Sequence, residues 1–209
     1  MAATTSPQPQ PKQADPNATL PLGGWLFRHR TWLPLPLAAA IFLIPGSGGT
    51  GSAPWLLGTA LVFAGEALRL WAVGHIGVIS RTRADRLGPL ISTGPFSLVR
   101  NPLYLGNIAV WVGFTVSARL VWMAPLILVV AGLGYHAIVR WEEQLLAARF
   151  GDSYRSYAAA VPRWIPTEAR VPRATSGSAY SWRETLFSER GTFIAIAAGY
   201  LLLYVKSQV

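Results

Sequence analysis

The sequence contains no cysteine and few charged residues. Without cysteine, the 209-residue chain has no disulfide, no thiolate metal ligand and no cysteine nucleophile. Only 13% of its residues are charged, against roughly 25% in a typical soluble domain, and 52% are hydrophobic. Nine Trp residues suit a membrane protein, because indole places an apolar body in lipid and its N–H at the headgroups. The composition therefore favours an integral membrane protein.

Familiar catalytic and metal-binding motifs are also missing from the sequence. It contains no HExxH, GxSxG, P-loop or Rossmann glycine pattern. His75 and His136 are isolated histidines without partners at metal-ligand spacing, so we interpret them as structural or solvated residues. We expect no metal site.

The chain divides into a polar tail and one hydrophobic domain. Residues 1–21 are rich in Pro, Gln, Thr and Ala and have too little apolar surface to fold, which predicts a disordered tail. The remaining residues, 22–209, have the length of a single domain.

Five apolar spans follow the tail. Crossing a bilayer needs about 20 mostly apolar residues, with a lower range near 17. The second, third and fourth spans reach that length, whereas the first, interrupted by Pro34 and Pro36, and the fifth are marginal. We therefore predict an all-α, polytopic bundle of about five transmembrane helices with short cytoplasmic interfacial helices. The spans are 32–45, 55–73, 102–118, 121–139 and 192–205.

Positive charge is distributed unevenly between the segments that connect the spans. Fifteen Arg and Lys residues lie before the first span, between the second and third, and between the fourth and fifth. The alternate segments contain only Arg119 and Lys206. Because Arg and Lys are enriched on the cytoplasmic side, this pattern predicts a cytoplasmic N-terminus and a C-terminus on the opposite side. It also explains the net charge of +9 without a nucleic-acid partner.

Two sequence blocks lie at the ends of apolar spans. The first, at 94–106, reads GPFSLVRNPLYLG, and the second, at 142–166, reads EEQLLAARFGDSYRSYAAAVPRWIP. The third and fourth spans are joined by only a few residues, so they must form an antiparallel hairpin. We therefore expect the two blocks to meet at the same membrane face.

Local signals predict how each block folds. Pro102 suits the first turn of a helix, and Gly106 permits close approach of another helix or of a ligand. In the second block we expect the helix to continue to Phe150 and to stop at Gly151. Asp152 is predicted to cap a further short helix over 153–160.

Together the blocks resemble the signature of integral-membrane methyltransferases, namely the isoprenylcysteine carboxyl methyltransferases and their phospholipid N-methyltransferase relatives. The second block matches that family's pattern E-E-x-x-L-x-x-x-F-G-x-x-Y-x-x-Y-x-x-x-V-x-R-x-x-P throughout. The first departs from G-x-Y-x-x-x-R-H-P-x-Y-x-G at Phe96 and Asn101. The resemblance covers about 66–166. It implies methyl transfer from S-adenosylmethionine to a lipophilic or membrane-associated substrate, with membrane lipid as a further partner.

The resemblance also implies where the cofactor binds. Glu142 would accept hydrogen bonds from the hydroxyl or amino groups of S-adenosylmethionine, and Tyr104 and Glu142 are the candidate catalytic residues. Glu143, which follows Glu142, is interpreted as the partner of a nearby Arg. The implied cofactor-binding residues are Gly88, Pro89, Leu90, Ile91, Phe96, Arg100, Asn101, Pro102, Leu103, Tyr104 and Glu142.

Two departures from the family pattern affect the chemistry. Asn101 keeps a hydrogen-bonding side chain but cannot titrate as His does, so a proton-shuttle role is lost there. Isoprenylcysteine methyltransferases place a substrate-directed Arg where this chain has Ile138, which weakens a prenylcysteine carboxylate as the substrate. An amine substrate would need a base, for which Tyr104, Glu143 and His136 are candidates.

Alternatives remain open at this point. Phospholipid N-methylation is the first. NADPH-dependent reduction is more distant, since sterol reductases carry similar R-H-P-x-Y patterns but have more spans and lack the E-E-x-x-L run. A non-enzymatic membrane protein is the third. Glu66 and Arg69, spaced i, i+3 within a span, suit a functional intramembrane site and a local ion pair equally well.

Overall fold

The computed structural model describes residues 21–47, 51–76, 90–166 and 181–208, and within these ranges the chain is helical without a strand. This confirms the all-α prediction. The predicted tail, apart from Pro21, and the predicted cofactor ligands Gly88 and Pro89 lie outside the described residues. The α-helices are α1 (Pro21–His29), α2 (Leu35–Leu43), α3 (Ala53–Ile76), α4 (Pro102–Ser117), α5 (Ala124–Phe150), α6 (Asp152–Ala160) and α7 (Trp182–Gln208).

Three helical segments are long and apolar enough to cross a membrane: α3, the stretch Val121–Phe150 that includes α5, and α7. The apolar helix α4, with 16 residues, is shorter. The predicted first span, 32–45, contains only the nine residues of α2, or about 14 Å of helix at 1.5 Å per residue. Helix α7 is longer than the predicted fifth span, 192–205, because the helix begins ten residues earlier, at Trp182.

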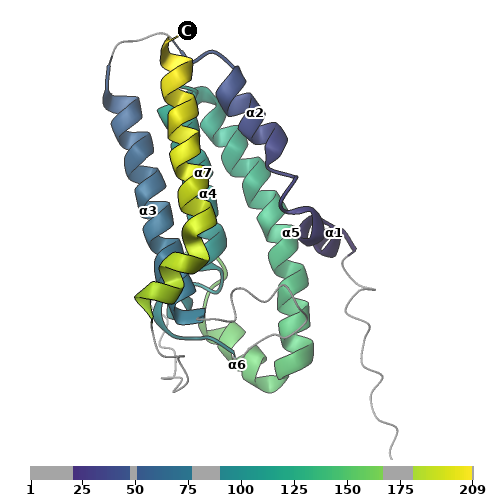
Figure 1. The fold of residues 1–209 in the computed structure, drawn as a ribbon. Helices are drawn as coiled ribbons and strands as arrows, with labels where there is room; N and C mark the ends of the chain where they lie inside the picture. Colours follow the sequence, from purple (N-terminus) through teal and green to yellow (C-terminus); the bar gives the residue numbers. More distant parts are fainter. Residues whose placement is uncertain (1–20, 48–50, 77–89, 167–180, 209) are drawn as a thin grey trace, which may run out of the picture.

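The long helices alternate in direction. In Figure 1, α3 and α5 run toward the end of the molecule where α6 lies, and α4 and α7 run back toward the other end, where the C-terminus lies. The predicted antiparallel hairpin of α4 and α5 is therefore confirmed. The first block enters α4 and the second leaves α5, so both lie at the α6 end.

Helices α3 and α4 pack with their backbones close together because glycines line the contact. A Cβ atom on Gly106 of α4 would lie 2.7 Å from the backbone oxygen of Gly65 on α3. One on Gly113 would lie 2.7 Å from the backbone oxygen of Gly58. Small residues that allow this approach are typical of helix contacts in membranes. The expectation that Gly106 admits a neighbouring helix is confirmed, and the neighbour is α3.

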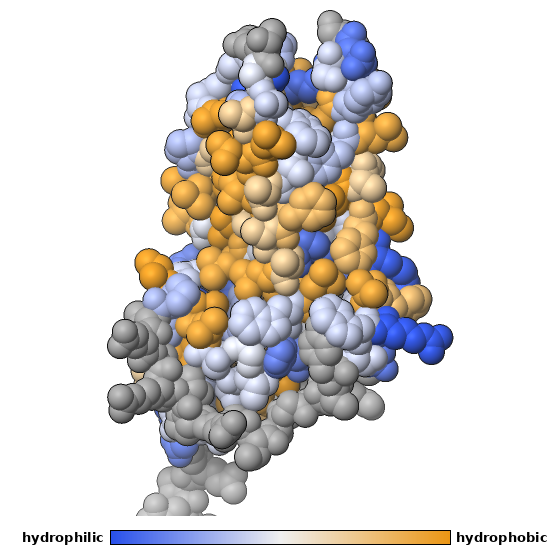
Figure 2. Space-filling model, turned by 90° about the vertical axis from the view of Figure 1, so that its left-hand side faces the viewer, coloured by the Kyte–Doolittle hydropathy of each residue, from blue (hydrophilic) through white to orange (hydrophobic). Residues whose placement is uncertain are grey.

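Many large apolar side chains on α3, α5 and α7 face outward. Phe63 of α3, Leu133 of α5 and Ile194 of α7 are each about two-thirds exposed. On the side where α3 lies, hydrophobic side chains predominate over the middle of the face (Figure 2). Such a surface suits lipid rather than water. A smaller packed core contains Ile41, Phe114, Leu120, Ile127 and Leu203.

Candidate functional site

The first block forms a tight turn that leads into α4. Residues Gly94–Ser97 are a short 3₁₀ helix, in which Gly94 has φ +59° and the imidazole of His75 occupies the space that a Cβ would need. Helix α4 then begins at Pro102, as predicted. Asn101 makes no side-chain cap. The backbone N–H groups of Leu103 and Tyr104, in the first turn, therefore have no helical acceptor.

The second block folds nearly as predicted. Helix α5 ends at Phe150, and Gly151 follows with φ +54°, a conformation that favours glycine. The predicted cap at Asp152 is wrong: this residue is the first of α6 and forms an ion pair with Arg155. The reason is that α6 begins directly at the glycine turn, so Gly151, which has no side chain, occupies the N-cap position.

Tyr154 and Tyr157 share the buried face of α6, as predicted. They pack with Val161, and Leu90 lies against the same cluster. The Tyr157 hydroxyl donates to the backbone oxygen of Phe96, 2.8 Å away. Burial raises the pKa of both tyrosines, so both remain neutral near pH 7. Their packing places α6 directly under the first block.

An ionic cluster of Arg100, Glu143 and Arg163 joins the two blocks. Arg163 donates to both carboxylate oxygens of Glu143 at 2.6 and 3.0 Å, and Arg100 Nε lies 3.4 Å from Oε1 of that carboxylate. Hydrogen bonding to Glu143 raises the pKa of Arg163. The Asn101 side-chain amide donates to the Arg163 backbone oxygen at 3.3 Å. The interpretation of Glu143 as an arginine partner is confirmed, and Arg100 and Asn101 both contribute to this junction.

Tyr104 and Glu142 meet between α4 and α5. The Tyr104 hydroxyl donates to Glu142 Oε2 at 3.0 Å, while no hydrogen bond to the other oxygen, Oε1, is observed among the described residues. The Tyr104 ring also packs against Tyr135, with centroids 5.0 Å apart and planes at 36°. The structure thus brings together the two predicted catalytic residues and adds Tyr135. The signal for Tyr135 in the sequence is its position seven residues before Glu142, on the same face of α5.

Helix α1 covers this part of α5. Phe27 packs against Trp141 with ring centroids 5.0 Å apart, and Gly24 lies against the same indole. Arg30, which follows α1, is close enough to Glu142 to act on its carboxylate electrostatically. Nothing in the sequence analysis assigned α1 to the site.

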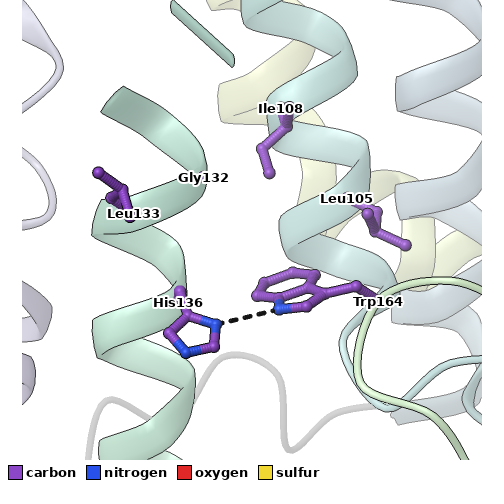
Figure 3. Close-up of a pocket in the computed structure, with 6 residues that line it drawn as sticks. All are labelled: Leu105, Ile108, Gly132, Leu133, His136 and Trp164. Carbon is purple, nitrogen blue, oxygen red and sulfur yellow. Dashed lines mark hydrogen bonds between the residues drawn. The ribbon is translucent and has the colours of Figure 1, made fainter. Parts of the chain in front are cut away.

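An apolar pocket of about 390 Å³ lies between α4 and α5. His136 and Trp164 lie at one end of it, where the indole N–H donates to His136 Nδ1 at 3.2 Å (Figure 3). Trp164 belongs to the second block, so that block also contributes to the pocket wall. The lining residues are Leu105, Ile108, Gly132, Leu133, His136 and Trp164.

The position that carries a substrate-directed Arg in isoprenylcysteine methyltransferases is apolar and buried here. Ile138 is only 3% exposed, inside the bundle. Within the described ranges, no group of three or more His, Asp or Glu side chains is placed to hold a metal ion.

A second polar group, centred on Arg69, lies among α3, α4 and α7. Arg69 pairs with Glu66 at 3.1 Å, which confirms the local ion pair. It also pairs with Glu189 of α7, and donates to Asn107 of α4 and, at 3.1 Å, to Thr192. Glu189 could not be predicted from the sequence as a partner of Arg69, because the two residues are 120 positions apart and share no local pattern.

Comparison with known proteins agrees with the sequence resemblance. Residues 54–153 match the model of the phospholipid methyltransferase family. The nickel-cobalt-cadmium resistance protein NccN of Alcaligenes xylosoxydans xylosoxydans is 27% identical over 151 residues, 71% of this chain and 70% of that protein. The cobalt-zinc-cadmium resistance protein CzcN of Cupriavidus metallidurans is 28% identical over 155 residues, 69% and 67% of the two chains. No solved structure matches significantly.

Proposed function

Because residues 54–153 carry the phospholipid methyltransferase pattern, we propose that this protein is a membrane methyltransferase that uses S-adenosylmethionine. The observation that supports this most directly is the pairing of Tyr104 with Glu142, which brings one residue from each of the two blocks to one place. The metal resistance in the relatives' names is a property of those proteins, and we propose no metal ligand for this chain.

The side chains around Glu142 suit the chemistry of that cofactor. Glu142 Oε1 can accept hydrogen bonds from ribose hydroxyls or an amino group. The first-turn N–H groups of Leu103 and Tyr104 can donate to a carboxylate, which the positive end of the α4 dipole also favours. The faces of Tyr104 and Tyr135 attract a cation such as a sulfonium. Acceptors, donors and aromatic faces for the polar cofactor are thus all present.

Catalysis at such a site depends mainly on alignment. S-adenosylmethionine supplies a methyl group that is already activated for in-line displacement. The Tyr104 hydroxyl holds the Glu142 carboxylate in place, and the Arg100–Glu143–Arg163 cluster holds the block that carries Tyr104 against α6. Contacts that fix these side chains in one geometry lower the entropic cost of aligning the reacting groups.

The apolar pocket lined by His136 and Trp164 provides a place for the methyl acceptor. Its lining of Leu105, Ile108 and Leu133 suits a lipid chain, and it lies between two helices of the bundle. We propose a lipophilic acceptor of the isoprenylcysteine carboxylate type. The second candidate is a phospholipid amine, and two observations favour it: the matching family is that of phospholipid methyltransferases, and Ile138 offers no cation for a carboxylate.

Cofactor binding tests the proposal directly. We expect S-adenosylhomocysteine to bind the detergent-purified protein saturably in titration calorimetry, and Glu142→Ala to weaken binding by roughly 10- to 100-fold. That range corresponds to about 1.5–3 kcal/mol for hydrogen bonds to a charged group. Arg155→Ala is the control, because Arg155 is exposed on α6 and its ion pair within the described residues is with exposed Asp152. Absence of binding to the folded wild-type protein would overturn the proposal and make NADPH the next ligand to test.

The methyl acceptor is identified by label transfer. Protein in vesicles containing phosphatidylethanolamine, with N-acetyl-S-farnesylcysteine added, would be incubated with methyl-labelled S-adenosylmethionine. Label in the farnesylcysteine ester supports the first candidate, and label in the phospholipid headgroup supports the second. Label in neither, despite cofactor binding, would exclude both acceptors.

A further inference from the structure

The pocket between α4 and α5 has two unlike ends. Helix α5 runs toward α6, so His136 lies nearer to α6 than Gly132 does, by about 6 Å for four residues at 1.5 Å each. At the α6 end, the imidazole of His136 and the indole of Trp164 have ring centroids 6.3 Å apart and share a hydrogen bond. Farther from α6 the lining is Ile108, Gly132 and Leu133 (Figure 3). The pocket is therefore polar at its α6 end and apolar at the other.

This change in polarity matches the way a lipid lies in a membrane. A lipid keeps its polar group at the interface and its hydrocarbon chain toward the bilayer centre, and Trp side chains favour the interface. A lipid in the pocket would accordingly place its polar group near Trp164 and His136. Its chain would extend past Gly132, away from α6.

The polar end of the pocket is next to the candidate cofactor site along both helices. Leu105, which lines the pocket, directly follows Tyr104 in α4, and His136 directly follows Tyr135 in α5. The rings of the two tyrosines pack against each other with centroids 5.0 Å apart. The polar group of a lipid in the pocket would therefore lie at the level of the Tyr104 and Tyr135 contact.

Gly132 leaves open space at the pocket wall. A Cβ atom added there would meet no atom within 4 Å. Gly106 and Gly113 of α4 differ, because a Cβ on either would collide with the backbone of α3. Their small size therefore serves helix packing, whereas that of Gly132 does not. Because glycine is unfavourable inside a helix, Gly132 calls for another explanation.

Gly134 provides a matched comparison on the same helix. A Cβ on Gly134 would also meet no atom within 4 Å, but Gly134 does not line the pocket. Two residues along a helix correspond to a turn of about 200°, so Gly132 and Gly134 face nearly opposite directions. A side chain at Gly132 would narrow the pocket, and the same side chain at Gly134 would not.

We propose that Gly132 is a specificity-determining residue, which by lacking a side chain admits the hydrocarbon chain of the methyl acceptor, with the acceptor's polar group at the Trp164 and His136 end. The inference rests on the proposed function in taking this pocket as the acceptor site. It restricts the acceptor to lipids whose reactive group is at the polar end of the chain.

The first test observes chain binding without catalysis. An S-farnesylcysteine analogue and a phosphatidylethanolamine, each with a diazirine in its hydrocarbon chain, would be irradiated with the protein in vesicles, and the labelled peptides mapped by mass spectrometry. We expect one of these probes to label the α4 and α5 segments that line the pocket. Gly132→Leu should lose this labelling and Gly134→Leu should keep it. Ile108→Phe, which narrows the pocket from α4, should reproduce the loss.

The second test measures methyl transfer to the acceptor that the wild type uses. We expect Gly132→Leu to raise the KM for this acceptor by roughly tenfold or more, because filled space in an apolar pocket excludes part of the chain. An acceptor with a shorter chain should lose less. The affinity for S-adenosylhomocysteine and the thermal unfolding midpoint should stay near those of Gly134→Leu.

The outcomes separate this inference from the proposed function. The inference is overturned if neither probe labels the pocket segments of the wild type. It is also overturned if Gly132→Leu and Ile108→Phe match Gly134→Leu in labelling and in KM, even when the wild type transfers methyl groups. Labelling that Gly132→Leu abolishes, in a protein that binds no S-adenosylhomocysteine, would uphold the chain site and refute the proposed function instead.

Discussion

Glu142 and Glu143 are adjacent in sequence yet have different surroundings. Glu143 receives hydrogen bonds from Arg163 and lies beside Arg100, so its charge is neutralised by the protein. Glu142 receives a single hydrogen bond, from the Tyr104 hydroxyl. Because a helix turns about 100° per residue, neighbouring side chains face different partners. The Glu143 carboxylate therefore joins the two blocks, and Glu142 is the carboxylate that we propose for cofactor binding.

His136 is the other residue whose chemistry depends on one contact. Its Nδ1 accepts the Trp164 indole proton, and indole nitrogen can only donate. A neutral imidazole has one donor and one acceptor nitrogen, so the proton of neutral His136 must be on Nε2. In neutral His136, Nε2 is then a donor, which argues against a role for that nitrogen as a base.

This tautomer is testable by NMR. We predict that the ¹⁵N-labelled imidazole of His136, assigned by its loss in His136→Gln, is protonated on Nε2 near neutral pH. Trp164→Phe should remove the preference, because phenylalanine has no N–H to donate. A proton found on Nδ1 in the wild type would contradict the observed hydrogen bond.

At the scale of helices, the contact between α3 and α4 determines where the site lies. Gly106 stands one turn into α4, and a Cβ there would lie 2.6 Å from Arg69 Cγ as well as against the Gly65 backbone. The glycine therefore allows α4 to approach α3 and lets the Arg69 side chain pass between them. The positions of both Tyr104 and Arg69 depend on this close approach of α4 to α3.

We accordingly predict that Gly106→Ala destabilises the protein by about 1–3 kcal/mol, the usual cost of overpacking a close contact. Gly134→Ala in α5 is the matched control, because a Cβ there meets no atom within 4 Å. It should be neutral or stabilising by up to about 1 kcal/mol through helix propensity. Denaturation of both variants in detergent measures the difference. Equal stability of the two would show that α3 and α4 separate easily.

At the scale of the whole molecule, the alternation of helices brings four segments to one end. The C-terminal end of α3, the start of α4, the end of α5 and the start of α7 all lie where α6 lies, and the C-terminus lies at the opposite end (Figure 1). Among the described residues, Arg100, Arg149, Arg155 and Arg163 of the cation-rich segments lie at this α6 end. This arrangement supports the expectation of a cytoplasmic site and a C-terminus across the membrane.

The absence of cysteine makes this orientation easy to test, because any introduced cysteine is unique. Ser153→Cys on α6 and Ser207→Cys near the C-terminus both replace exposed residues. In intact cells, a maleimide that cannot cross membranes should label only Ser207→Cys, and both variants after lysis. Labelling of Ser153→Cys alone in intact cells would mean that the orientation is the reverse of the expected one. Equal labelling of both variants would mean that α7 does not cross the membrane.

The features that the sequence determines by itself are local ones. The turn at Gly151, the start of α4 at Pro102 and the buried pair Tyr154 and Tyr157 all follow from backbone preferences or helical spacing within a few residues. The meeting of the two blocks also follows, because a short connection permits only an antiparallel hairpin. The partnership of Glu143 with arginine could also be predicted, because arginines lie near Glu143 in the sequence.

Only the tertiary structure decided which distant residues complete the site. The ion pair of Arg69 with Glu189, the approach of α1 to Trp141 and the packing of Tyr135 on Tyr104 join different helices, and no sequence period links them. The same holds for the short α2, where apolar composition suggested a span but the helix extends for only nine residues. Helix formation depends on neighbouring residues and can be predicted from local sequence, whereas contacts between helices depend on how the whole bundle packs.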